Sequence, residues 1–147
     1  MTENNIYSEI NRNSRNELIS FIQQLSDKQL AHEMPAGWSV LAVLTHLAFW
    51  DLRALILIKK WQSEGITHSI IDTDVINEVS RPLLLAIDPT KGKQLVIDVA
   101  EEIDLTIESL SPQFINDIEE KGKTVHLNRA KHRLMHIAEI KKALTVQ

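Results

Sequence analysis

Apolar residues recur every three to four positions over four long segments, and this spacing constrains the fold more than any other feature of the sequence. The segments span residues 5–25, 39–63, 93–110 and 125–145. None alternates apolar and polar residues convincingly, as a half-buried strand does. With 4 glycines and 4 prolines in 147 residues, the chain also has few of the residues that form turns between strands. The pattern therefore predicts an all-α fold.

Four amphipathic helices of about 17–25 residues can bury their apolar faces only on one another, which predicts a four-helix bundle. The length suits a single domain over residues 1–147. The link between the second and third helices is long enough for a crossover connection. It also contains a pattern for a short extra helix over 74–85, capped by Asp74 and disturbed by Pro82. The order of connections stays open.

The expected helix ends rest on a few residues. Ser39 is an N-cap candidate for the second helix, and Gly65 is the residue at which that helix is expected to stop. Breaks are predicted at four further places, which are residues 34–37, 88–92, 111–112 and 120–123.

Composition excludes several function classes. Cys is absent, so the chain has no disulfide framework, no Cys-bound zinc and no thiol nucleophile. The net charge is −4, and no basic cluster is large enough for a nucleic-acid footprint, so we expect no binding to nucleic acid. The first 14 residues lack the apolar core of a signal peptide. Residues 41–58 are the most apolar stretch, but they include Asp51 and Arg53, so we expect no membrane span and a cytoplasmic location.

The six histidines are the main candidates for chemistry. His132 and His136 are four residues apart, which places both imidazoles on one face of a helix, where they can reach the same metal ion. About 0.24 such pairs are expected by chance, so a solvated or hydrogen-bonded pair is the alternative. On a helical wheel the pair borders the apolar stripe that includes Ile137 and Ile140, which favours a metal site inside the bundle.

His46 lies inside the most apolar helix, on a face that it shares with Val43 and Trp50. A charged imidazolium is costly to bury, so this residue requires either a hydrogen-bond partner or a metal. His46 lies about 10 Å from the start of its helix, and the His132–His136 pair about 13 Å from the start of the last helix. Parallel helices would bring all three histidines to one height, and an antiparallel arrangement stays open.

Three neutral His ligands would leave a position on the metal for water or substrate, as in catalytic zinc sites. Arg133 stands where the HExxH motif carries its general base, so position assigns no base. No glycine-rich phosphate loop and no G-x-S-x-G motif occur. We interpret the three tryptophans as packing residues (Trp38, Trp50 and Trp61).

Three stretches resemble one known family. Residues 37–51 (GWSVLAVLTHLAFWD) resemble the second helix of the DinB/YfiT-like superfamily of four-helix bundles, which starts Trp-Ser/Thr-Val and carries a His seven or eight residues on. Residues 132–140 (HRLMHIAEI) resemble the last helix of that superfamily, and residues 26–30 (SDKQL) the link before its second helix. The resemblance covers nearly the whole chain in order and spacing. One departure is Ala42, where relatives often carry a polar or acidic residue.

The resemblance implies that His46, His132 and His136 are the ligands of one divalent metal ion, zinc or nickel first, with iron or manganese as alternatives. It also implies a homodimer, which the apolar residues around much of the second helix independently favour. Some relatives are S-transferases or isomerases that use low-molecular-weight thiols such as bacillithiol or mycothiol. His32 and His126 match no family ligand and are expected at the surface.

The preferred hypothesis is a metal-dependent thiol S-transferase acting on a small-molecule substrate. One alternative is a metal-dependent hydrolase in which metal-bound water attacks. The other is a non-catalytic helical dimer that binds a metal or a small molecule in a stress response.

Overall fold

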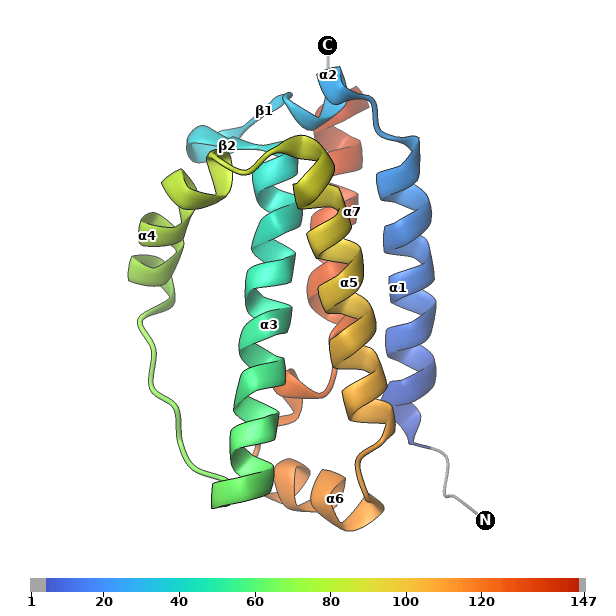
Figure 1. The fold of residues 1–147 in the computed structure, drawn as a ribbon, viewed down its shortest axis with the longest axis vertical. Helices are drawn as coiled ribbons and strands as arrows, with labels where there is room; N and C mark the ends of the chain where they lie inside the picture. Colours follow the sequence, from blue (N-terminus) through green and yellow to red (C-terminus); the bar gives the residue numbers. More distant parts are fainter. Residues whose placement is uncertain (1–4, 146–147) are drawn as a thin grey trace.

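The structure is a computed structural model that describes residues 5–145, and the all-α prediction is confirmed for this part of the chain (Figure 1). Seven α-helices make up most of it, and they are α1 (Ile6–Gln24), α2 (Asp27–Leu30), α3 (Val40–Glu64), α4 (Thr73–Leu85), α5 (Pro89–Glu108), α6 (Pro112–Glu120) and α7 (Ala130–Thr145). A small two-stranded sheet flanks the loop before α3, where the sequence predicted a break. Strands β1 (Glu33–Met34) and β2 (Trp38–Ser39) pair antiparallel around the Pro-Gly loop before α3.

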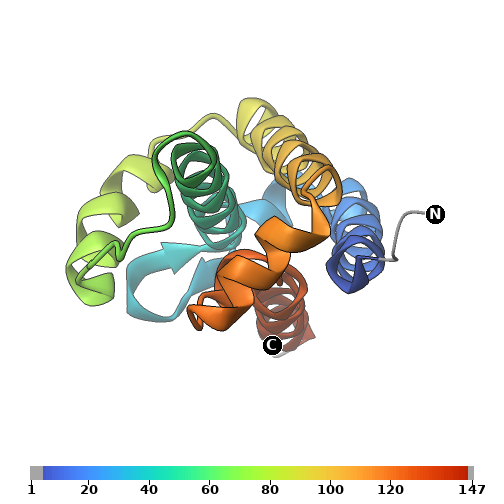
Figure 2. The same cartoon turned by 90° about the horizontal axis from the view of Figure 1, so that it is seen from below.

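The four long helices α1, α3, α5 and α7 lie side by side around a common interior (Figure 2). Helices α1 and α7 run in one direction, and α3 and α5 run in the other. Since α3 and α5 are parallel, the chain must return along the length of α3 before α5 begins. The segment that contains α4 makes this return on the outer side of α3. The link, for which the sequence left a crossover open, is therefore a crossover connection.

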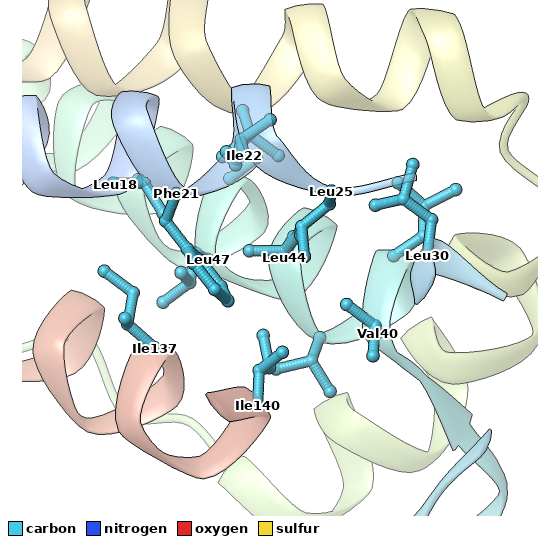
Figure 3. Close-up of a cluster of buried hydrophobic side chains, with 14 of the residues drawn as sticks. Leu18, Phe21, Ile22, Leu25, Leu30, Val40, Leu44, Leu47, Ile137 and Ile140 are labelled. Atoms are coloured by element: carbon cyan, nitrogen blue, oxygen red, sulfur yellow. The ribbon is translucent and has the colours of Figure 1, made fainter. Parts of the chain in front are cut away.

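Two apolar clusters form the interior. One contains Leu18, Leu44 and Ile140, and Figure 3 shows how side chains from α1, α3 and α7 meet in it. The other surrounds Trp61 and Ile107 near the end covered by α6. Both clusters form where the apolar faces of the helices, recognised in the sequence by their spacing, pack against one another.

A buried polar layer separates the two apolar clusters. Along α1 and α3, its residues fall between those of the first cluster and those of the second. On α5, Asp104 directly follows Ile103, where the second cluster begins. The layer contains six polar or charged residues, all buried, and they are Asn11, Ser14, Asp51, Asp104, Arg129 and Arg133.

Two predicted breaks are helix starts. Asp88 caps α5 through its side chain, and Pro89 is the first helical residue, so the helix begins four residues before the predicted Lys93. Likewise, Ser111 caps α6, a helix that the sequence did not predict. Proline is favoured at the first helical position, where its missing N–H costs nothing.

The other helix ends agree more closely with the sequence. The Ser39 hydroxyl accepts a hydrogen bond from the Ala42 N–H at 3.0 Å, and Gly65 ends α3 with φ 92°. Helix α4 begins at Thr73 under an Asp72 cap, not an Asp74 cap, and Pro82 lies inside it. The last helix starts later than predicted, at Ala130 instead of Val125.

Of the described helices, α3 is the one whose length and composition would allow it to cross a membrane. However, 72% of its most apolar stretch is buried inside the structure, and the core helix of a soluble protein passes the same test.

Candidate metal centre

The structure brings His46, His132 and His136 together, as the sequence predicted. Each offers one ring nitrogen, and these atoms all lie within 4.8 Å of one another. The Nε2 atoms of His132 and His136 are 3.1 Å apart. The ring of His46 faces both other rings edge-on, at centroid distances of 5.2 and 5.1 Å.

Helices α3 and α7 meet in antiparallel orientation at this site. His132 lies in the first turn of α7 and His136 in the next, while His46 lies two turns into α3. The parallel arrangement considered for the sequence is therefore wrong. It assumed a helix start at Val125, and the later start at Ala130 shifts the pair toward the N-terminal end of α7.

The three imidazoles are held in their neutral form. Burial, followed by the proximity of His136, lowers the pKa of His46 from 6.5 to about 4. Burial and the neighbouring imidazoles of His136 and His46 lower the pKa of His132 to about 3. Burial also lowers the pKa of His136, although Glu139 opposes this effect. Neutral imidazole is the form that binds metals.

The donor set could hold one divalent cation. Two nitrogens at about 2.1 Å from one ion are at most about 4.2 Å apart. The Nε2 atoms of His132 and His136, 3.1 Å apart, satisfy this limit, and the ring nitrogen of His46 lies within 4.8 Å of the other two donors. The alternative, in which His132 and His136 are only hydrogen-bonded to each other, does not account for His46. Its buried Nδ1 has no hydrogen-bond partner among the described residues. An unpaired buried nitrogen is costly without a ligand.

Glu139 lies beside His136, and sequence reasoning did not single it out. One of its carboxylate oxygens is 3.2 Å from Nδ1 of His136, one helical turn away on the same face. A carboxylate on the second ring nitrogen is a common way to orient a metal-binding His and to raise its basicity. Its i,i+3 spacing from His136 is the signal that could have identified it.

The three histidines line a cavity of about 780 Å³ between α3, the segment that leads into α4, and the start of α7. Trp50 also lines this cavity, and Trp38 lines a smaller one of about 170 Å³ that His46 lines as well. Both rings meet His46 edge-on, so these tryptophans form part of the site as well as of the packing. Trp61 is a buried core residue, as predicted.

His126, which was predicted at the surface, lies in the site. His126 is half-buried, lines the large cavity and packs edge-on against Trp61 at 5.3 Å. The prediction failed because residues 124–126 form a short 3₁₀ turn, in which the ring of His126 packs on Trp61, and not the first turn of the last helix. His32 is exposed, as expected.

Arg133 anchors the helix that carries the His132–His136 pair. Its guanidinium is fully buried and donates to both carboxylate oxygens of Asp104 at 2.8 and 2.9 Å and to Asp51 at 3.2 Å. Arg129 donates from Nε to the other oxygen of Asp51 at 2.8 Å. Asp51 therefore ties α3 to the start of α7, five residues beyond His46. A carboxylate inside the most apolar helix was the sequence signal for this network.

Asn11 of α1 supports the same end of α7. Its side-chain amide donates to the Leu127 carbonyl at 2.8 Å, and its carbonyl oxygen accepts from the Arg129 N–H at 2.8 Å. Three neighbouring helices thus fix the position and rotation of α7, and with them the direction of its imidazoles.

No family model, curated protein or solved structure matches the chain. The resemblance to the DinB/YfiT-like superfamily therefore stays a prediction.

We expect the metal-free protein to lose stability as the pH falls from about 7 to about 5. His46, His126 and His132 have folded pKa values of about 3 to 4, while an unfolded His has a pKa near 6.5, so the unfolded state binds more protons in this window. Each such group contributes a slope of at most about 1.4 kcal/mol per pH unit. Urea unfolding in the presence of a chelator measures the effect.

In that experiment, His132→Gln should reduce the slope. The control His32→Gln, at an exposed site, should leave it unchanged. A wild-type protein equally stable at both pH values would show that these imidazoles are not buried in their neutral form.

Proposed function

We propose that the protein is a metal-dependent enzyme of the DinB/YfiT-like kind, a cytoplasmic four-helix bundle in which His46, His132 and His136 hold one divalent cation. The observation that carries the proposal is the convergence of three neutral imidazoles at the wall of an open cavity. A sealed site or a fourth protein ligand would favour a structural or storage role. Zinc and nickel are the preferred ions, because imidazole suits both, and iron or manganese are the alternatives.

The reaction that we favour is transfer of a low-molecular-weight thiol to an electrophilic small molecule. The thiol sulfur forms a bond to the electrophilic carbon, the leaving group departs with the electron pair of the broken bond, and the thiol proton passes to solvent. A divalent cation in this site would supply a Lewis acid that favours the thiolate form. The chain has no Cys of its own, so the sulfur must come from the second substrate.

The protein's own residues position and shield this reaction. The anchored α7 holds two of the imidazoles in place, and a carboxylate oxygen of Glu139 lies 3.2 Å from Nδ1 of His136. Trp50 and Met135 cover apolar parts of the cavity wall, which lowers the exposure of a bound substrate to water. The half-buried His126 remains neutral, with a pKa lowered to about 4 by burial and by Arg53, so it is a weak base at neutral pH.

Hydrolysis is the alternative chemistry that the same cavity supports, with water in place of the thiol. The rival from another class is a non-catalytic dimer that holds a metal or a small molecule in a stress response. The cavity beside the imidazoles favours an enzyme over this rival.

Cobalt-loaded protein distinguishes these functions. We expect 2-mercaptoethanol to produce a new near-ultraviolet absorption band in the cobalt-loaded protein and to be consumed when an alkylating electrophile is added. The band should be absent from the His132→Ala variant. An unchanged cobalt spectrum at saturating thiol would contradict thiol transfer, and turnover that survives removal of the metal would contradict a metal-dependent enzyme.

The homodimer stays a prediction. Fifteen residues of α3 are buried within one chain. The fold of a single chain therefore already covers much of the apolar helix surface from which the dimer was predicted. The large apolar residues of α3 and α4 that remain exposed are Leu52 and Ile56 of α3 and Val75, Val79, Leu83 and Leu85 of α4.

A further inference from the structure

The wall of the large cavity carries positive charge that no carboxylate in the cavity balances. Arg53, Arg129 and Lys131 line it, and none of the described residues that line it is Asp or Glu. We call these three residues the basic wall. They lie around the same space as His46, His132 and His136.

Arg53 is held in place but not neutralised. Its Nη2 donates to the Ser69 hydroxyl at 3.0 Å, and its guanidinium lies 5.8 Å from the centre of the Trp50 ring. Neither contact involves a negative charge. Among residues 5–145, the hydrogen bonds of Arg53 use Nη2 alone, so its other donors are available to a ligand.

Arg129 has an ionic partner that it must share. Asp51 accepts from both Arg129 and Arg133, and Asp104 accepts from both Arg133 and Arg15. The buried network thus contains three guanidinium groups and two carboxylates, which leaves one excess positive charge. Arg129 is the one of the three that reaches the cavity.

Two further features agree with this charge distribution. Arg53, Arg129 and Lys123 add to the effect of burial in lowering the pKa of His126, which shows that these cations act on the cavity. The first turn of α7 also borders the cavity, and the N-terminal end of a helix carries partial positive charge.

We propose that the basic wall binds the oxyanion group of a small-molecule substrate whose reacting end lies at His46, His132 and His136. The planar guanidinium fork matches a carboxylate or sulfonate, and a partly buried cation is screened less by water and salt than an exposed one. A cavity of about 780 Å³ has room for both ends of such a molecule. The location of the reacting end rests on the proposed function, whereas the anion site itself does not.

Isothermal titration calorimetry with matched thiols tests the proposal. The full chain, loaded with one equivalent of zinc, is titrated with 2-mercaptoethanesulfonate, 3-mercaptopropionate and the neutral 2-mercaptoethanol. We expect both anionic thiols to bind at least tenfold more tightly than the neutral one. In Arg53→Gln this preference should fall to less than threefold. The control Lys59→Gln, an exposed cation on the same helix and outside the cavity, should preserve it.

The metal-free protein separates this proposal from the proposed function. Ethanesulfonate should bind it and should bind Arg53→Gln at least tenfold more weakly. Equal binding of charged and neutral thiols to the zinc-loaded protein would overturn the basic wall and leave thiol binding intact. Ethanesulfonate binding without any thiol binding would support the basic wall and contradict the thiol function. If Arg53→Gln fails to fold, Lys131→Gln, at an exposed position, provides the same comparison.

Discussion

Replacing Arg133 with Gln is expected to lower the free energy of unfolding by about 3–5 kcal/mol, the cost of removing one partner from a buried ion pair. The variant leaves the carboxylates of Asp51 and Asp104 buried, with Arg129 and Arg15 as their remaining cations. It also removes hydrogen bonds from α7 to α1 and α5. Urea unfolding followed by circular dichroism measures the change.

Arg12→Gln is the matched control. Arg12 also pairs with a carboxylate of α5, Glu108, at 3.2 Å, but both side chains are more than 40% exposed. Removing such a surface pair should change the free energy of unfolding by about 1 kcal/mol or less. Similar losses in both variants would contradict the role given to the buried polar layer.

Zinc is expected to stabilise the folded chain strongly. A ligand that binds only the folded state, at a free concentration about 1,000 times its dissociation constant, adds about 4 kcal/mol to the free energy of unfolding. The unfolded chain cannot hold His46 beside the His132–His136 pair, because these residues are more than 80 positions apart in sequence. Thermal or urea unfolding with and without zinc measures the gain.

In His136→Ala the zinc-dependent gain should fall below about 1 kcal/mol at the same zinc concentration. The comparison is made within each variant, so any loss of packing cancels. His32→Ala, which removes an exposed histidine, should retain the full gain. A gain of equal size in the wild type and in His136→Ala would mean that zinc binds elsewhere.

Local sequence patterns predicted the long helices, because an apolar stripe with a 3.6-residue period needs no tertiary information to be recognised. These patterns failed at proline, which can either end a helix or occupy its first position. Pro89 and Pro112 were interpreted as helix breakers, yet each follows a capping side chain and starts a helix. Residues 125–129 continue the apolar pattern of α7, but tertiary hydrogen bonds from Asn11 hold this segment outside the helix.

The candidate ligands were predictable because two of them are neighbours on one helical face and the third interrupts an apolar helix. Their surroundings were not, since those depend on contacts between residues far apart in the chain. Asp51 and Arg133 are 82 residues apart, and the position of each gave no indication of the other. The direction of α7 relative to α3 likewise depends on the connections, which the sequence left open.

The central claim is that His46, His132 and His136 together bind one divalent cation, and metal content at equilibrium tests it most directly. Wild-type protein and the three single His→Ala variants are dialysed against zinc and then against metal-free buffer, and each is analysed for zinc per chain. Circular dichroism verifies that every variant is still helical. We predict about one zinc per wild-type chain and a loss of stoichiometric zinc in each variant. One full equivalent in all three folded variants, or none in the wild type, would contradict the assignment.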